Sequence, residues 1–397
     1  MSCIERRAGR AARAVGWLGF LTFLASLPAV SQTDHARLWQ AYAGRFISGD
    51  GRVIDPQGSD RTTSEGQSYA LFFALVNNDR GRFDKLLTWT ENNLASSDLG
   101  AHLPAWSWGK AKDSHWGILD ANSASDSDLW IAYDLIEAGR LWNSLHYATL
   151  GRRLAAIIAR KEVANLPGLG PALLPGPMGF QFARSWVLNP SYSPLFILDR
   201  LAVVDPDGPW SNVAQEIPVL LERSAKNGFA MDWVSYAPGH GFSPTVATGS
   251  KASSKQQQPL GSYDAIRVYL WAGMLADSVA AKTKIIHALP GMDLYLRSRG
   301  APPERISGDG APQSQDGPVG FSAALLPYLR ASSNEAAVAQ QLVRIKSQLD
   351  EKSNLYGAGY GTGPTYYDQN LILFGSGWIE QRFQFGSSGE LLVRWTR

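Results

Sequence analysis

Apolar residues recur at helical spacing along most of this 397-residue chain. In segment 124–142, Leu129, Ile131, Leu135 and Trp142 follow the spacing of one amphipathic helix. The same periodicity predicts helices over 35–46, 65–76, 81–95, 124–142, 144–163, from Ser193, from Trp210, from Asp264, and over 280–299, 319–330, 335–349 and 366–383. We expect a break near Pro290, and Pro327 leaves the end of its helix open. Segment 389–397 alternates weakly and is predicted as a short strand or a tail.

The predicted helices alternate in character along the chain. The even-numbered ones are more apolar and aromatic, whereas the odd-numbered ones carry more of the arginines and lysines. A double ring produces this pattern, because its inner helices are buried on all sides and its outer helices on one. We therefore predict an all-α fold, an (α/α)6 barrel formed by residues 32–397 as a single domain. An irregular α-solenoid is the alternative, but the sequence shows no strict repeat of the kind that solenoids have.

Four connections are much longer than the others and are rich in Gly, Pro and Trp: 47–64, 96–123, 164–192 and 227–262. Each precedes a predicted inner helix, so all four would lie on the face where those helices begin. Long ordered loops gathered on one face commonly build a functional site. The sequence therefore places the candidate site at the starts of the inner helices.

Residues 1–31 have the features of a secretory signal peptide. Four arginines precede an apolar run of about 14 residues, and the small-residue pattern Ala29-Val30-Ser31 follows. We expect cleavage near Ser31 and a periplasmic or secreted protein. A membrane span needs about 20 residues, so an uncleaved N-terminal anchor is the less favoured alternative.

Composition excludes several other classes of protein. The net charge is +2, but residues 1–31 carry +3, so the remaining chain carries −1 and offers no basic field for nucleic acid or a membrane surface. The single cysteine, Cys3, lies in the predicted signal, so the exported chain would have no disulfide and no thiolate. The six histidines form no His-x-x-x-His pair. We expect neither a metal nor a cofactor.

Three predicted inner helices begin with an acidic residue close behind Ser or Thr: Glu65, Asp126 and Asp264. The plain explanation is that an acidic side chain in a first turn is stabilised by the helix dipole, with Ser123 or Ser125 as the cap of segment 124–142. Three such starts on one face also indicate that the carboxylates converge. Paired carboxylates without a thiol or a Ser-His dyad favour acid/base hydrolysis, and glycoside cleavage fits best.

One physical conflict accompanies this hypothesis. A helix N-terminus lowers the pKa of a carboxyl group, whereas a general acid has to keep its proton near neutral pH. Burial, or a second carboxylate nearby, would have to outweigh the dipole.

Aromatic residues in the long connections offer flat surfaces on which sugar rings can stack. They are Trp106, Trp108, Trp116, Trp186, Tyr192, Trp233 and Tyr236. Packing in the core is the competing explanation for each tryptophan.

Three segments resemble glycoside hydrolase family 8. They are Ala-Ser-Asp-Ser-Asp-Leu-Trp-Ile-Ala at 124–132, Thr-Ser-Glu-Gly-Gln-Ser-Tyr at 63–69 and Tyr-Asp-Ala-Ile-Arg at 263–267. They occur in the family's order, and the similarity spans roughly residues 36–385. Within the family, the chain is most similar to the periplasmic endoglucanases that accompany bacterial cellulose synthase. Ser127 and Asp134 depart from the residues usual in the family.

The resemblance implies a role for each matching residue. Glu65 would be the general acid, Asp264 the general base, and Asp126 would bind the sugar at the cleavage point. Tyr263 and Arg267 would hold the base and its water, and Tyr192 and Tyr367 would line the cleft. The family inverts the anomeric centre, which implies a separation of about 6.5–9.5 Å between the two catalytic carboxyls. The (α/α)6 barrel of the family agrees with the helix pattern.

The sequence thus predicts an inverting endo-β-1,4-glucanase that acts on cellulose, with the cellulose synthase complex as a candidate partner. One alternative is another polymer, namely xylan, chitosan or mixed-linkage glucan; Asp113, Asp120 and Asp232 in the cleft loops would suit the amines of chitosan. The other alternative is a glucan-binding subunit of an export machine without activity. Loss of Glu65 or Asp264 would have supported it, and both are present.

Overall fold

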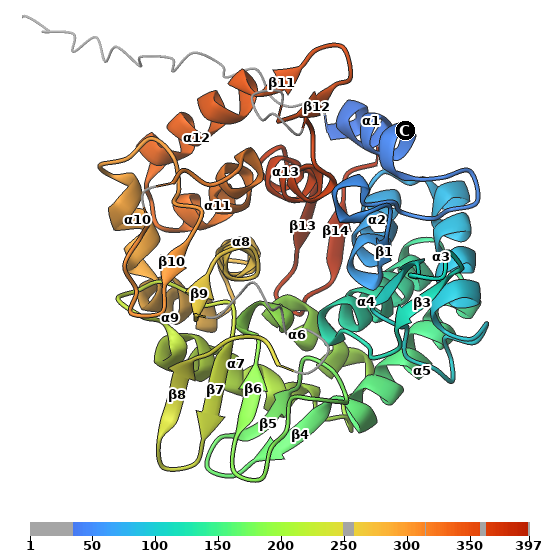
Figure 1. Ribbon diagram of the computed structural model, residues 1–397, viewed down its shortest axis with the longest axis horizontal. Coiled ribbons are helices and arrows are strands. Elements are labelled where there is room, and N and C mark those ends of the chain that lie inside the picture. Colours follow the sequence, from blue (N-terminus) through green and yellow to red (C-terminus); the bar gives the residue numbers. More distant parts are fainter. Residues whose placement is uncertain (1–34, 249–257, 314, 358–362, 396–397) are drawn as a thin grey trace, which may run out of the picture. The chain divides into compact units, whose positions relative to one another are not determined.

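Two concentric rings of helices make up the computed structural model, which describes residues 35–248, 258–313, 315–357 and 363–395 (Figure 1). The inner ring contains α2 (Ser64–Val76), α4 (Ser125–Leu141), α6 (Leu195–Val204), α8 (Ala265–Met274), α11 (Val319–Ala331) and α13 (Tyr366–Ile379). The outer ring contains α1 (His35–Phe46), α3 (Arg80–Leu94), α5 (Leu145–Lys161), α7 (Trp210–Ser224), α9 (Ala281–Ala288), α10 (Pro290–Leu296) and α12 (Glu335–Ser347). The predicted (α/α)6 barrel is confirmed. The predicted signal peptide lies outside the described residues.

Burial explains the alternation in the sequence. Every residue of α8 is buried, whereas α1 buries one stripe that includes Leu38, Trp39, Tyr42 and Phe46. A helix inside the ring meets protein on all sides, and a helix outside it meets the core on one face only. The predicted break near Pro290 separates α9 from α10, but Pro327 lies inside α11 and does not end it.

Two glycines allow inner helices to approach closely. A Cβ atom on Gly273 of α8 would lie 2.2 Å from the backbone nitrogen of Tyr328 in α11, and one on Gly375 of α13 would lie 2.0 Å from the carbonyl oxygen of Ala323 in α11. No side chain fits at either distance. The inner ring is therefore packed backbone to backbone on this side.

The long connections contain short antiparallel strands that the helical periodicity did not reveal. One sheet joins β1 (Thr62–Thr63), β2 (Ser107–Lys110) and β3 (Trp116–Asp120), and another joins β6 (Trp186–Leu188), β7 (Val234–Ala237) and β8 (Gly241–Pro244). Two-stranded pairs are β4 (Val163–Leu166) with β5 (Gly170–Leu173), β9 (Leu260–Gly261) with β10 (Ile306–Ser307), and β11 (Leu349–Asp350) with β12 (Leu355–Tyr356). Single 3-10 turns are η1 (Pro56–Gly58) and η2 (Pro190–Tyr192). The two larger sheets tie neighbouring loops together and stiffen the face that they cover.

A C-terminal hairpin, β13 (Phe383–Phe385) with β14 (Leu391–Val393), runs inside the inner ring (Figure 1). The ring of Phe385 stacks on Phe196 of α6 with 3.8 Å between centroids, and Phe383 contacts Phe72 of α2. The expected strand in segment 389–397 is thus β14. None of the helices in the described ranges is long and apolar enough to cross a membrane.

Candidate active site

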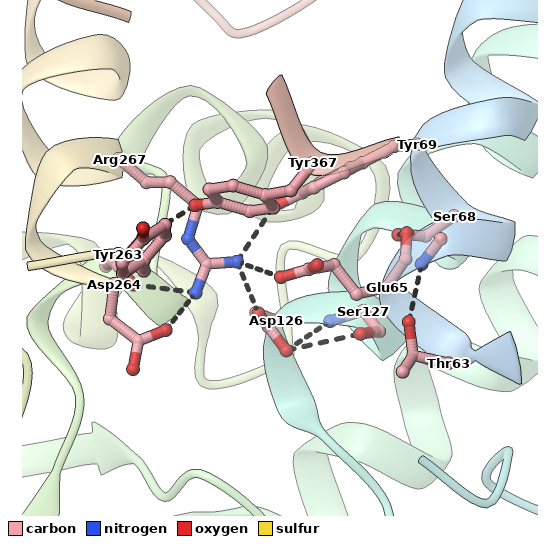
Figure 2. Close-up of polar contacts among 12 residues, drawn as sticks. Thr63, Glu65, Ser68, Tyr69, Asp126, Ser127, Tyr263, Asp264, Arg267 and Tyr367 are labelled. Carbon is pink, nitrogen blue, oxygen red and sulfur yellow. Dashed lines mark hydrogen bonds and ion pairs between the residues drawn. The ribbon is translucent and has the colours of Figure 1, made fainter. Parts of the chain in front are cut away.

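Arg267 is the centre of the candidate site (Figure 2). It projects from the first turn of α8, and its side chain is 2% exposed. Its Nη1 donates to Glu65 Oε2 at 2.5 Å and to Asp126 Oδ2 at 3.1 Å, while its Nη2 donates to Asp264 Oδ1 at 2.5 Å. One guanidinium group therefore gathers the three carboxylates that the sequence singled out, from the starts of three inner helices.

Arg267 also reaches neutral groups. Its Nη1 donates to the hydroxyl of Tyr69 at 2.9 Å, and its Nη2 to Ser191 Oγ at 3.2 Å. The Tyr192 ring lies 5.6 Å from the guanidinium carbon, within cation–π range. Nη1 has two hydrogens for three acceptors, and one positive charge faces three carboxyl groups. The arrangement favours a state in which at least one of these carboxyls keeps its proton.

Glu65 lies in the first turn of α2, next to the cap residue Thr63, whose hydroxyl accepts from the backbone nitrogen of Gly66. The hydroxyl of Tyr366 donates to Glu65 Oε1 at 3.0 Å. Burial raises the pKa of Glu65 above its ordinary value, Arg267 opposes that shift, and Asp126 adds to it. Burial therefore outweighs the stabilisation of the charged form, which resolves the conflict posed by the helix N-terminus.

Asp264 is the N-cap residue of α8, but its own side chain makes no cap hydrogen bond. The backbone nitrogens of Ile266 and Arg267 donate to carbonyl oxygens, and Asp232 accepts from the backbone nitrogen of Ala265 at 2.8 Å. The Asp264 carboxylate faces Arg267 and the cavity. Burial raises the pKa of Asp264 to about 6, against the opposing effect of Arg267. Asp264 is thus mostly ionised at neutral pH.

Asp126 opens α4, where the predicted capping was wrong. The cap position is Ala124, and no side chain caps the helix. Ser123 donates to Glu162 Oε1 at 2.5 Å, because that buried carboxylate competes for its hydroxyl. Asp126 Oδ1 instead accepts from the backbone nitrogen and the hydroxyl of Ser127, and Oδ2 remains for Arg267.

Two cavities meet at the carboxylates, one of about 510 Å³ and one of about 280 Å³. Both are lined by Arg61, Glu65, Asp264 and Tyr366. The larger adds mainly polar and acidic residues, namely Asp55, Gln57, Tyr263, Glu304, Gln315, Asp316, Pro318, Thr365, Tyr367 and Asp368. The smaller adds Thr63, Ser64, Trp106, Ala124, Asp126, Ser127, Tyr192, Trp233 and Ala247. An extended ligand could thus lie across the carboxylates, with one part in each cavity.

Some of the predicted aromatic residues line one of the two cavities, and others line neither. Trp106, Tyr192 and Trp233 line the smaller cavity, and Tyr263 and Tyr367 line the larger. Trp108 and Trp186 line neither. Trp108 stacks on Trp116, and Trp186 packs against Tyr236, its partner across strands β6 and β7.

The hydroxyl of Tyr263 donates to Glu304 Oε1 at 3.1 Å and not to Asp264. The hydroxyl of Tyr367 donates to the Tyr263 carbonyl oxygen at 2.6 Å (Figure 2). This pair therefore fixes the wall of the larger cavity beside Asp264.

The three aspartates proposed to suit chitosan lie elsewhere. Asp113 is exposed and pairs with His115, and Asp120 accepts from the backbone nitrogen of Asn122. Asp232 is buried against Ser262 and Ala265. None of the three lines either cavity.

Sequence reasoning missed Tyr366, Tyr69 and Ser191. Tyr366 opens the inner helix α13, so the rule that led to the three carboxylates, the convergence of inner-helix starts, would also have led to it. Tyr69 lies one turn after Glu65 on α2 and is fully surrounded by protein, which looks like core packing in a sequence. Ser191 lies in the η2 turn just before α6, where no periodic pattern marks it. Within the described ranges, no group of three or more His, Cys, Asp or Glu residues could hold a metal ion.

Comparisons with known proteins identify the family of this chain. The family model described as "Glycosyl hydrolases family 8" matches residues 16–381. The chain is 44% identical to an endoglucanase of Xanthomonas axonopodis pv. citri (strain 306), over 94% of this chain and 92% of that protein. It is 42% identical to an endoglucanase of Escherichia coli (strain K12), with 90% of both chains covered.

Among solved structures, the endo-1,4-D-glucanase from Vibrio fischeri ES114 matches with a TM-score of 0.78 and 40% identity, covering 91% of this chain and 99% of that one. A cold-adapted family 8 xylanase matches with a TM-score of 0.68 at 16% identity, which shows a common fold. The match of the family model to most of the chain, with two relatives above 40% identity, establishes that this chain belongs to glycosyl hydrolases family 8.

Proposed function

We propose that this family 8 glycosyl hydrolase is an inverting endo-β-1,4-glucanase with Glu65 as general acid and Asp264 as general base. The observation that carries the proposal is the arrangement around Arg267: two carboxyls with raised pKa values bind this one guanidinium group, and both line each of two adjoining cavities. Inverting hydrolysis needs one carboxyl on each side of the scissile bond, one protonated and one ionised. The names of the relatives, endoglucanases at 40–44% identity, support β-1,4-glucan as substrate.

Glu65 suits the role of acid because burial raises its pKa. In its protonated form it would donate to the glycosidic oxygen as the bond to the anomeric carbon breaks. The carboxylate that remains would be stabilised by Arg267 at Oε2 and by Tyr366 at Oε1. These two donors act most strongly on the charge that develops during the step.

Asp264 suits the role of base because its pKa of about 6 leaves it ionised at neutral pH. It would take a proton from a water molecule as that water attacks the anomeric carbon from the face opposite the leaving group. Arg267 Nη2 donates to one oxygen of the carboxylate and keeps the group oriented.

Asp126 and the aromatic residues would hold the sugar. Asp126 lies in the smaller cavity between Arg267 and Ser127, so its carboxylate can accept from a sugar hydroxyl at the cleavage point. Trp106, Tyr192 and Trp233 line the same cavity and would contact the apolar faces of the pyranose rings. Both cavities are lined by Glu65 and Asp264, so a glucan chain could extend on both sides of the bond that is cleaved, as cleavage within a chain requires.

The test uses purified residues 32–397 alongside the Glu65→Gln variant. Viscosity and reducing ends are followed on carboxymethyl-cellulose, and the anomer of the product is determined by proton NMR. We expect a rapid fall in viscosity and α-anomeric product from the wild type, and neither from the variant. Cleavage of only xylan, chitosan or mixed-linkage glucan would reassign the polymer. Binding of glucan without cleavage of any polymer would support the non-catalytic subunit instead.

Export and a role in cellulose synthesis form a further part of the proposal. The arginines and the apolar run of residues 1–31 support secretion into the periplasm, and the resemblance to periplasmic endoglucanases supports a link to cellulose synthase. N-terminal sequencing of the protein from a periplasmic extract should give a start near residue 32. A mature protein that retains the apolar run would favour an N-terminal anchor.

A further inference from the structure

Asp232 is a buried carboxylate outside both cavities that contacts the residues on either side of Asp264. It lies between Phe229 and Val234 in the connection before β7, and it is 4% exposed. Its Oδ1 accepts from the backbone nitrogens of Ser262 at 2.7 Å and Ala265 at 2.8 Å, and its Oδ2 accepts from Ser262 Oγ at 2.6 Å. One side chain thus spans the turn that carries Asp264.

The two segments that meet at Asp232 are fixed to each other by the backbone as well. The backbone nitrogen of Asp232 donates to the Leu260 carbonyl oxygen at 2.8 Å. A Cβ atom on Gly261 would lie 2.2 Å from the Ala230 carbonyl oxygen, so this contact requires glycine. The hydroxyl of Tyr269, from α8 itself, accepts from the backbone nitrogen of Ala230 at 3.0 Å. Asp232 is therefore held in place independently of Asp264.

This anchoring determines what the Asp264 side chain can do. An aspartate that caps a helix accepts from the second or third backbone N–H group of that helix. Here the N–H groups of Ile266 and Arg267 donate to the carbonyl oxygens of Ser262 and Asp264, and Asp232 accepts from the first one, that of Ala265. These first N–H groups thus have partners without the Asp264 side chain, whose carboxylate faces Arg267 and the cavities.

Asp232 also acts on Asp264 through its charge. It is a like charge beside Asp264 and raises the pKa of that carboxyl, after burial and against Arg267. The titratable and charged groups that face Asp264 from the surrounding elements are Arg267, Asp232, Asp126, Glu65, Tyr192 and Tyr367. Of the carboxylates in this set, Asp232 is the one that lines neither cavity.

We propose that Asp232 is a positioning residue for the general base: it holds the turn that carries Asp264 at the start of α8, and it places a second negative charge beside Asp264. This inference rests on the proposed role of Asp264. It assigns Asp232 no contact with the substrate, so its effects should appear in kcat and in the pH profile more than in KM.

Two variants of Asp232 separate the two parts of the inference, and two further variants serve as controls. Asp232→Asn keeps the shape and an oxygen for both backbone N–H groups, and the Ser262 hydroxyl can turn to accept from the new amide; only the charge is lost. Asp232→Ala removes both the charge and the hydrogen bonds to the turn. Asp264→Asn tests the base itself, and Asp113→Asn, at an exposed residue outside both cavities, is the control for loss of one charge.

kcat and KM are measured on a soluble β-1,4-glucan oligosaccharide from about pH 4 to about pH 9, together with thermal unfolding. In Asp232→Asn we expect the acidic limb of kcat/KM to move to lower pH by about one unit, because a base without a neighbouring like charge stays ionised at lower pH. In Asp232→Ala we expect the plateau kcat to fall about 100-fold, since the base loses its position. Asp113→Asn should match the wild type.

An acidic limb in Asp232→Asn that stays at the wild-type pH, or moves upward, would overturn the role of the charge. A plateau kcat in folded Asp232→Ala within about threefold of the wild type would overturn the positioning role. If Asp232→Ala does not fold, the pH profile of Asp232→Asn alone decides. Activity retained by Asp264→Asn would contradict the proposed function itself, which separates that failure from failure of this inference.

Discussion

A cluster of buried carboxylates and arginines lies at each end of helix α4, and the two clusters differ in the ratio of carboxylates to arginines. At the start of α4, Asp126 belongs to the carboxylate cluster, in which Glu65, Asp126 and Asp264 surround Arg267. Glu137 lies three turns further along, about 16 Å away. There the hairpin cluster consists of Glu137 with Arg140, Arg200 and the backbone of Leu391: Arg200 Nε donates to Oε1 at 2.6 Å, and Arg140 Nε and the Leu391 nitrogen donate to Oε2 at 2.9 and 2.8 Å.

The two clusters differ in how many positively charged partners each carboxylate has. In the hairpin cluster, donors outnumber carboxylates, so Glu137 is saturated and fixes hairpin β13–β14 to α4 and α6. In the carboxylate cluster, three carboxyls share one cation, Arg267, and burial raises the pKa values of Glu65 and Asp264 against its effect. Saturation gives a rigid joint, whereas a deficit of donors gives groups that can exchange protons.

The largest contrast should appear when one carboxylate is removed from the carboxylate cluster. Glu65→Gln and Asp264→Asn should each lower kcat by about 1,000-fold, since each removes a group that transfers a proton. Their free energy of unfolding should stay level or rise by up to about 1 kcal/mol, because fewer like charges surround Arg267. Kinetics on a soluble glucan and denaturant unfolding measure both quantities. A loss of several kcal/mol in either variant would mean that the cluster is a structural joint after all.

Removal of the carboxylate from the hairpin cluster should have the opposite effect. Glu137→Ala leaves two arginines without their partner in a buried place, which should cost about 3–5 kcal/mol of stability. At a temperature where the variant is folded, kcat should remain close to that of the wild type. The matched control is Glu335→Gln, which breaks the exposed pair with Arg330 at 3.8 Å and should cost less than about 1 kcal/mol. Equal losses in the two variants would contradict the contrast.

The pH dependence of wild-type activity should reflect protonation of the carboxylate cluster and not of the hairpin cluster. The pKa of Asp264 is raised to about 6, so activity should fall about tenfold for each pH unit below that value as the base becomes protonated. The affinity of Glu65→Gln for substrate should not fall over the same acidic pH range, since binding does not need an ionised base. Stopped assays of kcat/KM and calorimetric binding provide the two profiles. A limb centred near the ordinary value of aspartate would show that burial does not act on Asp264.

Much of this organisation could be predicted from the sequence, because it follows from periodic burial. The rings of helices and the convergence of Glu65, Asp126 and Asp264 both follow from where apolar faces and helix starts recur. The hydrogen-bond partners could not be predicted, since they depend on which side chains reach across the barrel. Ser123 donates to Glu162 and does not cap the helix, and Trp108 stacks on Trp116 and does not line a cavity. Nothing in the local pattern distinguishes these choices.

The smallest and most specific comparison uses two tyrosine hydroxyls, one beside each cluster. Tyr133 donates to the Gly389 carbonyl oxygen at 2.8 Å beside the hairpin, and Tyr366 donates to Glu65 Oε1 at 3.0 Å. Tyr133→Phe leaves a buried carbonyl without its donor and should cost about 1 kcal/mol of stability with no change in the pH profile. Tyr366→Phe removes a donor that lowers the pKa of Glu65, so that pKa should rise and the alkaline limb of kcat/KM should move to higher pH. Unfolding curves and pH profiles of both variants test the pair: a shift of the alkaline limb in Tyr133→Phe, or none in Tyr366→Phe, would show that the two clusters do not divide structure from proton transfer in this way.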